Sequence, residues 1–130
     1  MAAFRFGVDS FIWTEVFSEK DIWILPKAKE LGFDVVDLAI AHPESFPLEK
    51  VLEAKRQTGL ELVTTTTLGL DTNLISPDEA VRKNGINHMK RMVDINKAIG
   101  DVYKRQTRFS VYISMIGHSL IGNGGIFKGK

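Results

Sequence analysis

A length of 130 residues is that of a single domain, and a content of 44% hydrophobic and 25% charged residues is typical of soluble globular proteins. The absence of cysteine excludes disulfide frameworks, thiolate nucleophiles and cysteine-ligated zinc. A formal net charge of +1 gives no general electrostatic basis for binding nucleic acid, and no apolar run reaches the roughly 18 residues of a membrane-spanning helix. We therefore expect neither a nucleic-acid partner nor a membrane partner.

The first residues, MAAFRFGVDSFIW, do not form a secretory signal. Such a signal has a basic region followed by a continuous apolar run, and here Gly7, Asp9 and Ser10 interrupt the apolar residues. We expect a cytoplasmic protein.

Three apolar, β-type runs predict strands at residues 4–8, 35–40 and 60–67. Helix-like segments follow each run. In the first, Pro26 indicates either a short turn over residues 18–23 before a helix that opens near it, or a kink in a longer helix, and Gly32 closes the helix.

The second and third helices carry their own start and stop signals. Pro47 opens the second and Gly59 ends it, and its sheet-facing residues are predicted to be Leu48, Val51, Leu52 and Ala54. In the third, Ser76 is predicted as the N-cap of a capping box, with Pro77 at the first helical position and Glu79 reaching back. Its predicted apolar stripe is Ala80, Val81, Ile86, Met89, Val93 and Ile99, and Gly100 ends it.

Alternating strands and helices are the pattern of a parallel α/β fold. Three units occupy about 100 residues, so eight need about 270, close to the roughly 250 of a (β/α)8 barrel. The predicted fold class is α/β: a parallel sheet made of the first three βα units of a partial (β/α)8 TIM barrel. A smaller doubly wound sheet needs about five strands, and the last 30 residues do not supply two clean units.

Strand alternation assigns the polar side chains to one face of the sheet. That face carries Arg5, Gly7 and Asp9 from the first strand, Val35, Asp37 and Ala39 from the second, and Val63, Thr65 and Thr67 from the third. The opposite face carries Phe4, Phe6 and Val8 from the first strand. It is more apolar on the first two strands and suits contact with the helices, whereas the third strand is ambiguous. In a barrel the polar set faces the interior, with Asp9, Asp37 and Thr67 toward the strand ends that form active sites.

Each of these residues also has a purely structural interpretation. Asp37 would then accept hydrogen bonds from a loop, and Asp9 would cap the following turn. The threonines at 64–67 are good β-formers that need no function. Trp13 and Phe17 are either packing residues or an aromatic wall for a sugar ring.

The histidines and glycines add no specific motif. His42, His88 and His118 lack the spacing of a metal site, so we expect them to be structural or solvent-facing. The string GNGG at residues 122–125 lacks the strand before it and the helix after it that define a dinucleotide-binding loop.

Three segments together resemble a known family: FGVDSFIW, LPKAKELGFDVVDLA and ISPDEAVRKNGINHMKRMVDINKAIG. They are similar to the N-terminal third of the D-tagatose 3-epimerase and D-psicose (allulose) 3-epimerase group, within the xylose isomerase-like barrels. The resemblance covers about residues 4–100. Its most specific part is SPDEAVRKNG with the helix that follows.

This resemblance implies a (β/α)8 barrel that binds a divalent metal, manganese or magnesium, and inverts a ketose at C3 through a cis-enediolate. The metal is held by two glutamates, an aspartate and a histidine from later strands, so we expect no catalytic residue, metal ligand or cofactor in this chain. The positions that it implies for substrate binding are Trp13, Phe17, Asp37 and Thr67. Asp37 falls where relatives often have glutamate, and Asp9 replaces an aromatic residue of some relatives.

The composition changes near Gly100. Residues 1–100 hold 12 basic and 15 acidic residues, whereas residues 101–130 hold 5 and 1, and DVYKRQTRFS does not continue the family pattern. We expect residues 1–100 to be the N-terminal part of the barrel and 101–130 to be a tail that is not native to the parent protein. The alternative is a divergent strand at 109–116.

The sequence thus predicts part of a metal-dependent ketose 3-epimerase, inactive by itself, with a ketose as the parent's substrate. Another sugar or hydroxypyruvate isomerase of the same superfamily is one alternative, and a non-catalytic α/β module for a small polar ligand is another. Repair chemistry of the endonuclease IV type is disfavoured by the acidic first 100 residues. The sugar, the metal and the oligomeric state stay open, with a homo-oligomeric parent as one alternative.

Overall fold

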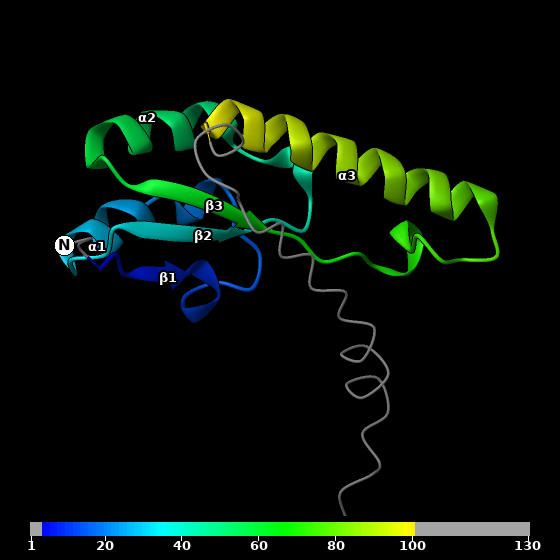
Figure 1. Ribbon diagram of the computed structural model, residues 1–130, viewed down its shortest axis with the longest axis horizontal. Coiled ribbons are helices and arrows are strands. Elements are labelled where there is room, and N and C mark those ends of the chain that lie inside the picture. Colours follow the sequence, from blue (N-terminus) through cyan, green and yellow to red (C-terminus); the bar gives the residue numbers. More distant parts are fainter. Residues whose placement is uncertain (1–3, 101–130) are drawn as a thin grey trace, which may run out of the picture.

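The computed structural model describes residues 4–100, and Figure 1 shows their arrangement. One sheet has three parallel strands in the order β1 (Gly7–Asp9), β2 (Val35–Ala39) and β3 (Glu61–Thr65). The helices that follow them are α1 (Ile24–Glu30), α2 (Leu48–Thr58) and α3 (Glu79–Ile99). Short 3-10 turns lie in the connections: η1 (Ser10–Ile12), η2 (Glu19–Asp21), η3 (Pro43–Ser45) and η4 (Leu70–Thr72). The predicted parallel α/β fold with three βα units is confirmed.

The hydrophobic core lies between the sheet and the helices. The strands contribute Val36, Leu38 and Leu62, and the helices contribute Ile24, Leu25, Ala28, Val51, Ala54, Met92, Ile95 and Ile99. Asp37 belongs to the other face of the sheet, as the alternation predicts. On β3, where the sequence left the faces open, Leu62 belongs to the core and Thr65 bonds to Asp37.

The first strand is shorter than predicted and begins three residues later. Pairing with β2 starts at Gly7, opposite Val35, and the preceding residue bonds to the chain just before β2: Phe6 N donates to Asp34 Oδ2 over 2.9 Å. The prediction that Phe4 and Phe6 pack on the helices is wrong, because they precede the paired stretch at the edge of the sheet and are 89% and 65% exposed. Val8 does pack against the core.

The helix ends follow their predicted signals in most places. A short turn, η2, precedes α1, which opens at Ile24 with Pro26 in its first turn, so of the two alternatives for Pro26 the turn is the one found. A glycine with positive φ follows each helix, at Gly32, Gly59 and Gly100, as predicted.

The start of α3 differs from the prediction by two residues. The N-cap is Asp78, whose carboxylate accepts from Ala80 N at 2.8 Å, and not Ser76. Ser76 Oγ instead accepts from Asp78 N, and the Arg82 guanidinium donates to the carbonyls of Ser76 and Pro77. The Asp78 carboxylate caps the first turn, so helical geometry begins only after it.

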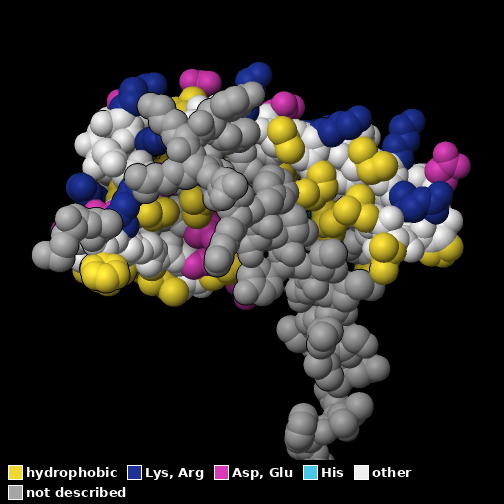
Figure 2. Space-filling model, in the orientation of Figure 1, with side chains coloured by type: hydrophobic (Ala, Val, Ile, Leu, Met, Phe, Trp, Pro, Cys, Tyr) yellow, Lys and Arg dark blue, Asp and Glu magenta, His cyan; other side chains and the backbone are white. Residues whose placement is uncertain are grey.

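The buried face of α3 coincides with the predicted apolar stripe only at Ile99. Ile86 and Val93 are 48% and 47% exposed, and hydrophobic side chains are visible along this helix in Figure 2. The buried residues are Gly85, His88, Met92, Ile95, Asn96 and Ile99. Gly85 lies against η4 so closely that a Cβ there would overlap the Thr72 carbonyl oxygen and lie 2.7 Å from Leu74 Cδ2. Close approach and polar partners thus determine which face of α3 is buried.

Residues 101–130 lie outside the described part of the chain. The predicted tail and the alternative strand at 109–116 both fall in this range and stay predictions. Within residues 4–100, no helix combines the length and the apolar composition that a membrane span requires.

We predict that Gly85→Ala destabilises the chain by about 1–2 kcal/mol in urea unfolding. Overlap with the backbone carbonyl of Thr72 costs about 2–3 kcal/mol, the upper end of the usual range for overpacking, and the higher helix propensity of alanine offsets roughly 1 kcal/mol of it. Asn87→Ala, at an exposed position of the same helix, controls for propensity alone. A Gly85→Ala chain as stable as the parent would contradict the close packing of α3 on η4.

Candidate functional site

The candidate site lies at and beside the C-terminal ends of the strands, which meet at one edge of a parallel sheet. Asp9 ends β1, and its Oδ1 accepts from Phe11 N at 2.8 Å, so it caps η1 as the structural interpretation predicts. The next residue, Ser10, is fully buried, and its Oγ accepts from Ala39 N at 2.9 Å. The ends of β1 and β2 are therefore joined by a side chain that the sequence analysis did not single out.

Asp37 is the most unusual polar group of the site. It stands opposite Asp9 in the strand register, and its Oδ2 accepts from Thr65 Oγ1 at 2.7 Å. Its Oδ1 is buried and has no hydrogen-bond partner among the described residues. This oxygen is free to accept from a donor that residues 4–100 do not supply.

Burial raises the pKa of the Asp37 carboxyl, because desolvation disfavours its charged form. The hydrogen bond from Thr65 opposes this pKa shift, and the neighbouring Asp9 carboxylate adds to it. The site therefore holds a carboxyl group that takes up a proton more readily than an exposed aspartate does.

The two predicted aromatic residues lie in the connection between β1 and α1, and they differ in exposure. Trp13 is half-buried, packs against the core and contacts Trp23 edge to face, with ring centroids 6.3 Å apart. Phe17 is only 3% exposed; its N–H donates to the Ala39 carbonyl, and its ring contacts Phe46 at 6.2 Å. Within this chain Trp13 offers more open surface than Phe17.

The four consecutive threonines have four different environments. Thr64 Oγ1 donates to Asn96 Oδ1 on α3 at 2.7 Å, Thr65 bonds to Asp37, and Thr66 Oγ1 bonds to the Ile40 carbonyl and to His88. Thr67 is exposed, two residues beyond Thr65. The structure thus brings Asp9, Asp37 and Thr65 together, and leaves Thr67 open beyond the end of β3.

Strand alternation alone could have found Thr65, since it places Thr65 on the face of Asp37. No sequence pattern predicts the hydrogen bond between Thr66 and His88, because the two residues are 22 positions apart and an irregular loop lies between them. His88 is buried, which agrees with the structural role expected for the histidines.

A metal ion would need several ligands from one place. Among residues 4–100, no group of three or more histidine, aspartate or glutamate side chains is arranged to hold one. The described residues are therefore suited to hydrogen bonding and packing, and do not form a metal centre by themselves.

Comparison with known proteins identifies the family. A sequence model described as xylose isomerase-like TIM barrel matches residues 25–105, more than half of the chain. The chain belongs to this family. Its three parallel βα units are accordingly the first part of a TIM barrel, as predicted.

Two relatives are named a ketose 3-epimerase and a probable ketose 3-epimerase. The chain is 30% identical over 97 residues to the ketose 3-epimerase of Arthrobacter globiformis, and 25% identical over 96 residues to a probable ketose 3-epimerase of Synechocystis sp.. Each match covers 74% of this chain and 34% or 33% of the relative. The chain thus spans about a third of the length of these relatives.

Solved structures support the fold. The D-allulose 3-epimerase of Methylomonas sp. in complex with D-allulose superposes with a TM-score of 0.69 at 18% identity, and a D-psicose 3-epimerase in the presence of D-fructose with 0.64 at 23%. Each match covers 74% of this chain and 34% of the solved one. At these identities the likeness establishes the barrel architecture alone.

We predict that Asp37→Asn stabilises the chain more at pH 7 than at pH 4. The folded state holds the Asp37 proton more tightly than the unfolded state, so the free energy of unfolding falls as pH rises from about 3.8 through the raised pKa of Asp37. Asparagine keeps the shape of the side chain and removes the titration. Urea unfolding at both pH values measures the difference.

Asp94→Asn, on the exposed surface of α3, controls for the loss of one negative charge. If Asp37→Asn changed stability equally at pH 4 and pH 7, burial of the Asp37 charge would not be the source of the effect.

Proposed function

We propose that this chain is the N-terminal third of a ketose 3-epimerase, and that residues 4–100 form one wall of its sugar site. The observation that carries this proposal is the 30% identity to the Arthrobacter globiformis enzyme, which extends over 97 residues. Two further observations support it: the match to solved epimerase barrels, and the polar face of the sheet at the strand ends.

Asp37 is the proposed polar contact to the sugar. A hydrogen bond from Thr65 fixes one carboxyl oxygen and leaves Oδ1 as an acceptor without a partner among residues 4–100. A sugar hydroxyl is a neutral donor of the size and type that this oxygen lacks, and a buried acceptor left unpaired costs about 1–3 kcal/mol. Binding a hydroxyl would remove that cost.

Trp13, Phe17 and Thr67 have complementary roles in this proposal. The half-buried indole of Trp13 offers an apolar surface to the carbon-bound hydrogens of the sugar, and Thr67 offers an exposed hydroxyl. Phe17 is nearly enclosed and acts mainly by supporting the connection in which Trp13 lies.

Proton transfer at C3 and the divalent metal, manganese or magnesium, are assigned to later units of the parent barrel. A bound metal would stabilise the negative charge of an enediolate. For residues 4–100, which do not form a metal centre by themselves, we propose only binding and orientation of the sugar.

We predict that the 130-residue chain has no epimerase activity of its own. It provides three βα units of the eight in a closed barrel and, among its described residues, no group able to hold a metal. The measurement is conversion of D-fructose, D-tagatose and D-allulose with added Mn²⁺. Metal-dependent turnover above the background of the Mn²⁺ solution would contradict this assignment.

A chimeric barrel tests whether residues 1–100 can form part of the sugar site of a ketose 3-epimerase. Residues 1–100 would replace the matching third of the Arthrobacter globiformis enzyme, and we expect the chimera to epimerise a ketose at C3. Trp13→Ala in this chimera should raise KM by roughly threefold to tenfold, equivalent to ~1 kcal/mol of lost contact, and should leave metal affinity unchanged.

Trp23→Ala is the matched control, because Trp23 contacts Trp13 edge to face and removal of either indole disrupts the same pair. An equal KM increase in both variants would show that Trp13 acts through packing and not through the sugar. A chimera that folds and binds the metal but epimerises no ketose would contradict the proposal that residues 4–100 form a wall of the sugar site.

A further inference from the structure

The two halves of α3 are held to the rest of the molecule in different ways. The C-terminal part buries Met92, Ile95, Asn96 and Ile99. In the stretch 79–91 only Gly85 and His88 are buried, and Val81, Arg82 and Met89 are half-buried. In Figure 1 this N-terminal half extends past the ends of the strands, alongside η4. Its attachment therefore depends on few buried residues, of which His88 is the one whose side chain bonds to the segment after β3.

The hydrogen bonds around His88 determine which ring nitrogen carries the proton. Thr66 Oγ1 donates to the Ile40 carbonyl at 2.7 Å and lies 2.7 Å from His88 Nε2. A hydroxyl has a single proton and a carbonyl oxygen only accepts, so His88 Nε2 must be the donor to Thr66. The neutral ring is then protonated at Nε2, and Nδ1 is the nitrogen that takes up a second proton.

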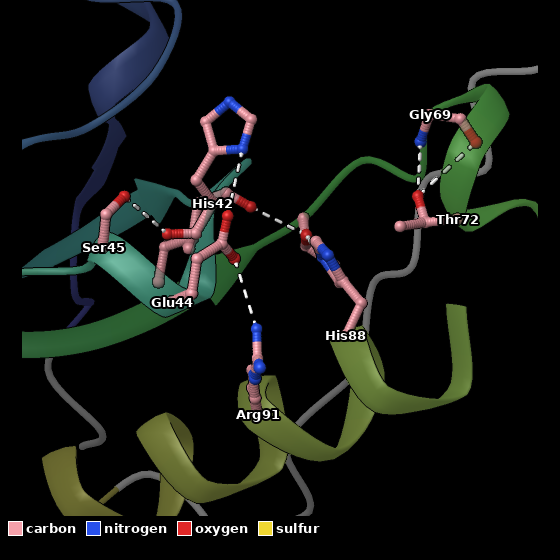
Figure 3. Close-up of polar contacts among 9 residues, drawn as sticks. His42, Glu44, Ser45, Gly69, Thr72, His88 and Arg91 are labelled. Carbon is pink, nitrogen blue, oxygen red and sulfur yellow. Dashed lines mark hydrogen bonds and ion pairs between the residues drawn. The ribbon is translucent and has the colours of Figure 1, made fainter. Parts of the chain in front are cut away.

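This chain of bonds connects three elements. His88 belongs to α3, Thr66 directly follows β3, and Ile40 directly follows β2. Figure 3 shows the His88 ring directed from α3 toward the segment after β3. Neutral His88 thus fastens the N-terminal half of α3 to the ends of two strands.

The surroundings of His88 disfavour a positive charge. Burial is the largest cause that lowers its pKa, and His42 and Arg91 lower it further, whereas Glu44 and Asp71 raise it. Glu44 is itself engaged, since Arg91 lies 3.7 Å from one of its oxygens and His42 Nδ1 lies 3.6 Å from the other (Figure 3). The Glu44 carboxylate near His88 is therefore already shared with Arg91 and with the His42 ring.

We propose that His88 is an acid-sensitive latch: its neutral ring holds the N-terminal half of α3 and η4 against the ends of β2 and β3. Protonation at Nδ1 keeps the Nε2–H donor to Thr66 but places a positive charge on a ring that is 8% exposed and forms no ion pair with a carboxylate among residues 4–100, so the closed position loses stability relative to one in water. The closed latch is stable above the ordinary histidine value of 6.5 and loses stability as pH falls from there through the lowered pKa of His88. This proposal rests on the fold alone and is independent of the sugar chemistry.

Hydrogen exchange of the full 130-residue chain, measured from pH 7.5 to pH 4.5 and corrected for intrinsic rates, tests the latch. Protection of the amides at 82–91 should fall as pH drops below 6.5, by at most about tenfold for each pH unit, and level off below the pKa of closed His88. Amides at 93–99 and in β2 should stay protected. Constant protection at 82–91 down to pH 4.5, or its loss together with β2, would overturn the proposal.

Two variants separate the latch from other acid effects. His88→Gln retains an N–H donor for Thr66 and does not titrate, so protection at pH 7.5 should persist and the acid response should vanish. His42→Gln removes the exposed histidine of the same cluster and should keep the acid response. An acid response unchanged in His88→Gln would overturn the proposal.

A third measurement needs no variant. NMR titration of the His88 ring in the unmodified chain should give a half-point below 6.5, the ordinary histidine value. A half-point at or above 6.5 would mean that the closed state tolerates the charged ring, and no latch would result.

Discussion

The division of β2 into two faces is the constraint on which the rest of the structure depends. β2 pairs with β1 on one side and β3 on the other, so its backbone groups are used on both edges and only its side chains distinguish the faces. Val36 and Leu38 face the helices, and Asp37 faces the opposite way. A slip of one residue would place the Asp37 carboxylate in the apolar core and remove the leucine from it, at a cost of several kcal/mol. The two adjoining strands must therefore match this register.

What the sequence could predict are the features that depend on local geometry. The two-residue period of a strand assigned Asp37 and Leu38 to opposite faces before any partner was known. Positive φ after a helix favours glycine on steric grounds, so Gly59 and Gly100 were sufficient to end α2 and α3. These rules need no knowledge of what packs against the element.

The buried face of α3 could not be predicted in this way, because its neighbours select it. Gly85 is buried because it has no side chain and can therefore contact the Thr72 carbonyl. Asn96 and His88 are buried because threonine side chains form hydrogen bonds with them. Thr64 and Thr66 stand two residues apart on one side of the chain, and they meet Asn96 and His88, two helical turns apart. Hydropathy ranks such residues as surface positions, so the sequence favoured Ile86 and Val93 instead.

Asp37 also bears on which groups complete the polar face of the sheet, because its Oδ1 has no hydrogen-bond partner among residues 4–100. Three described βα units of eight agree with the 34% of the Arthrobacter globiformis relative that the chain covers, so we expect the missing donors to this face on the rest of a barrel or on a ligand. A lysine or arginine beside Asp37 would hold its carboxyl ionised and lower its pKa, which would suit a permanent ion pair. Burial and the adjacent Asp9 act in the opposite direction. Among residues 4–100, burial on β2 and the register that sets Asp9 opposite Asp37 are thus the two causes that raise this pKa, and the proposed sugar hydroxyl would be a neutral donor to a carboxyl in that state.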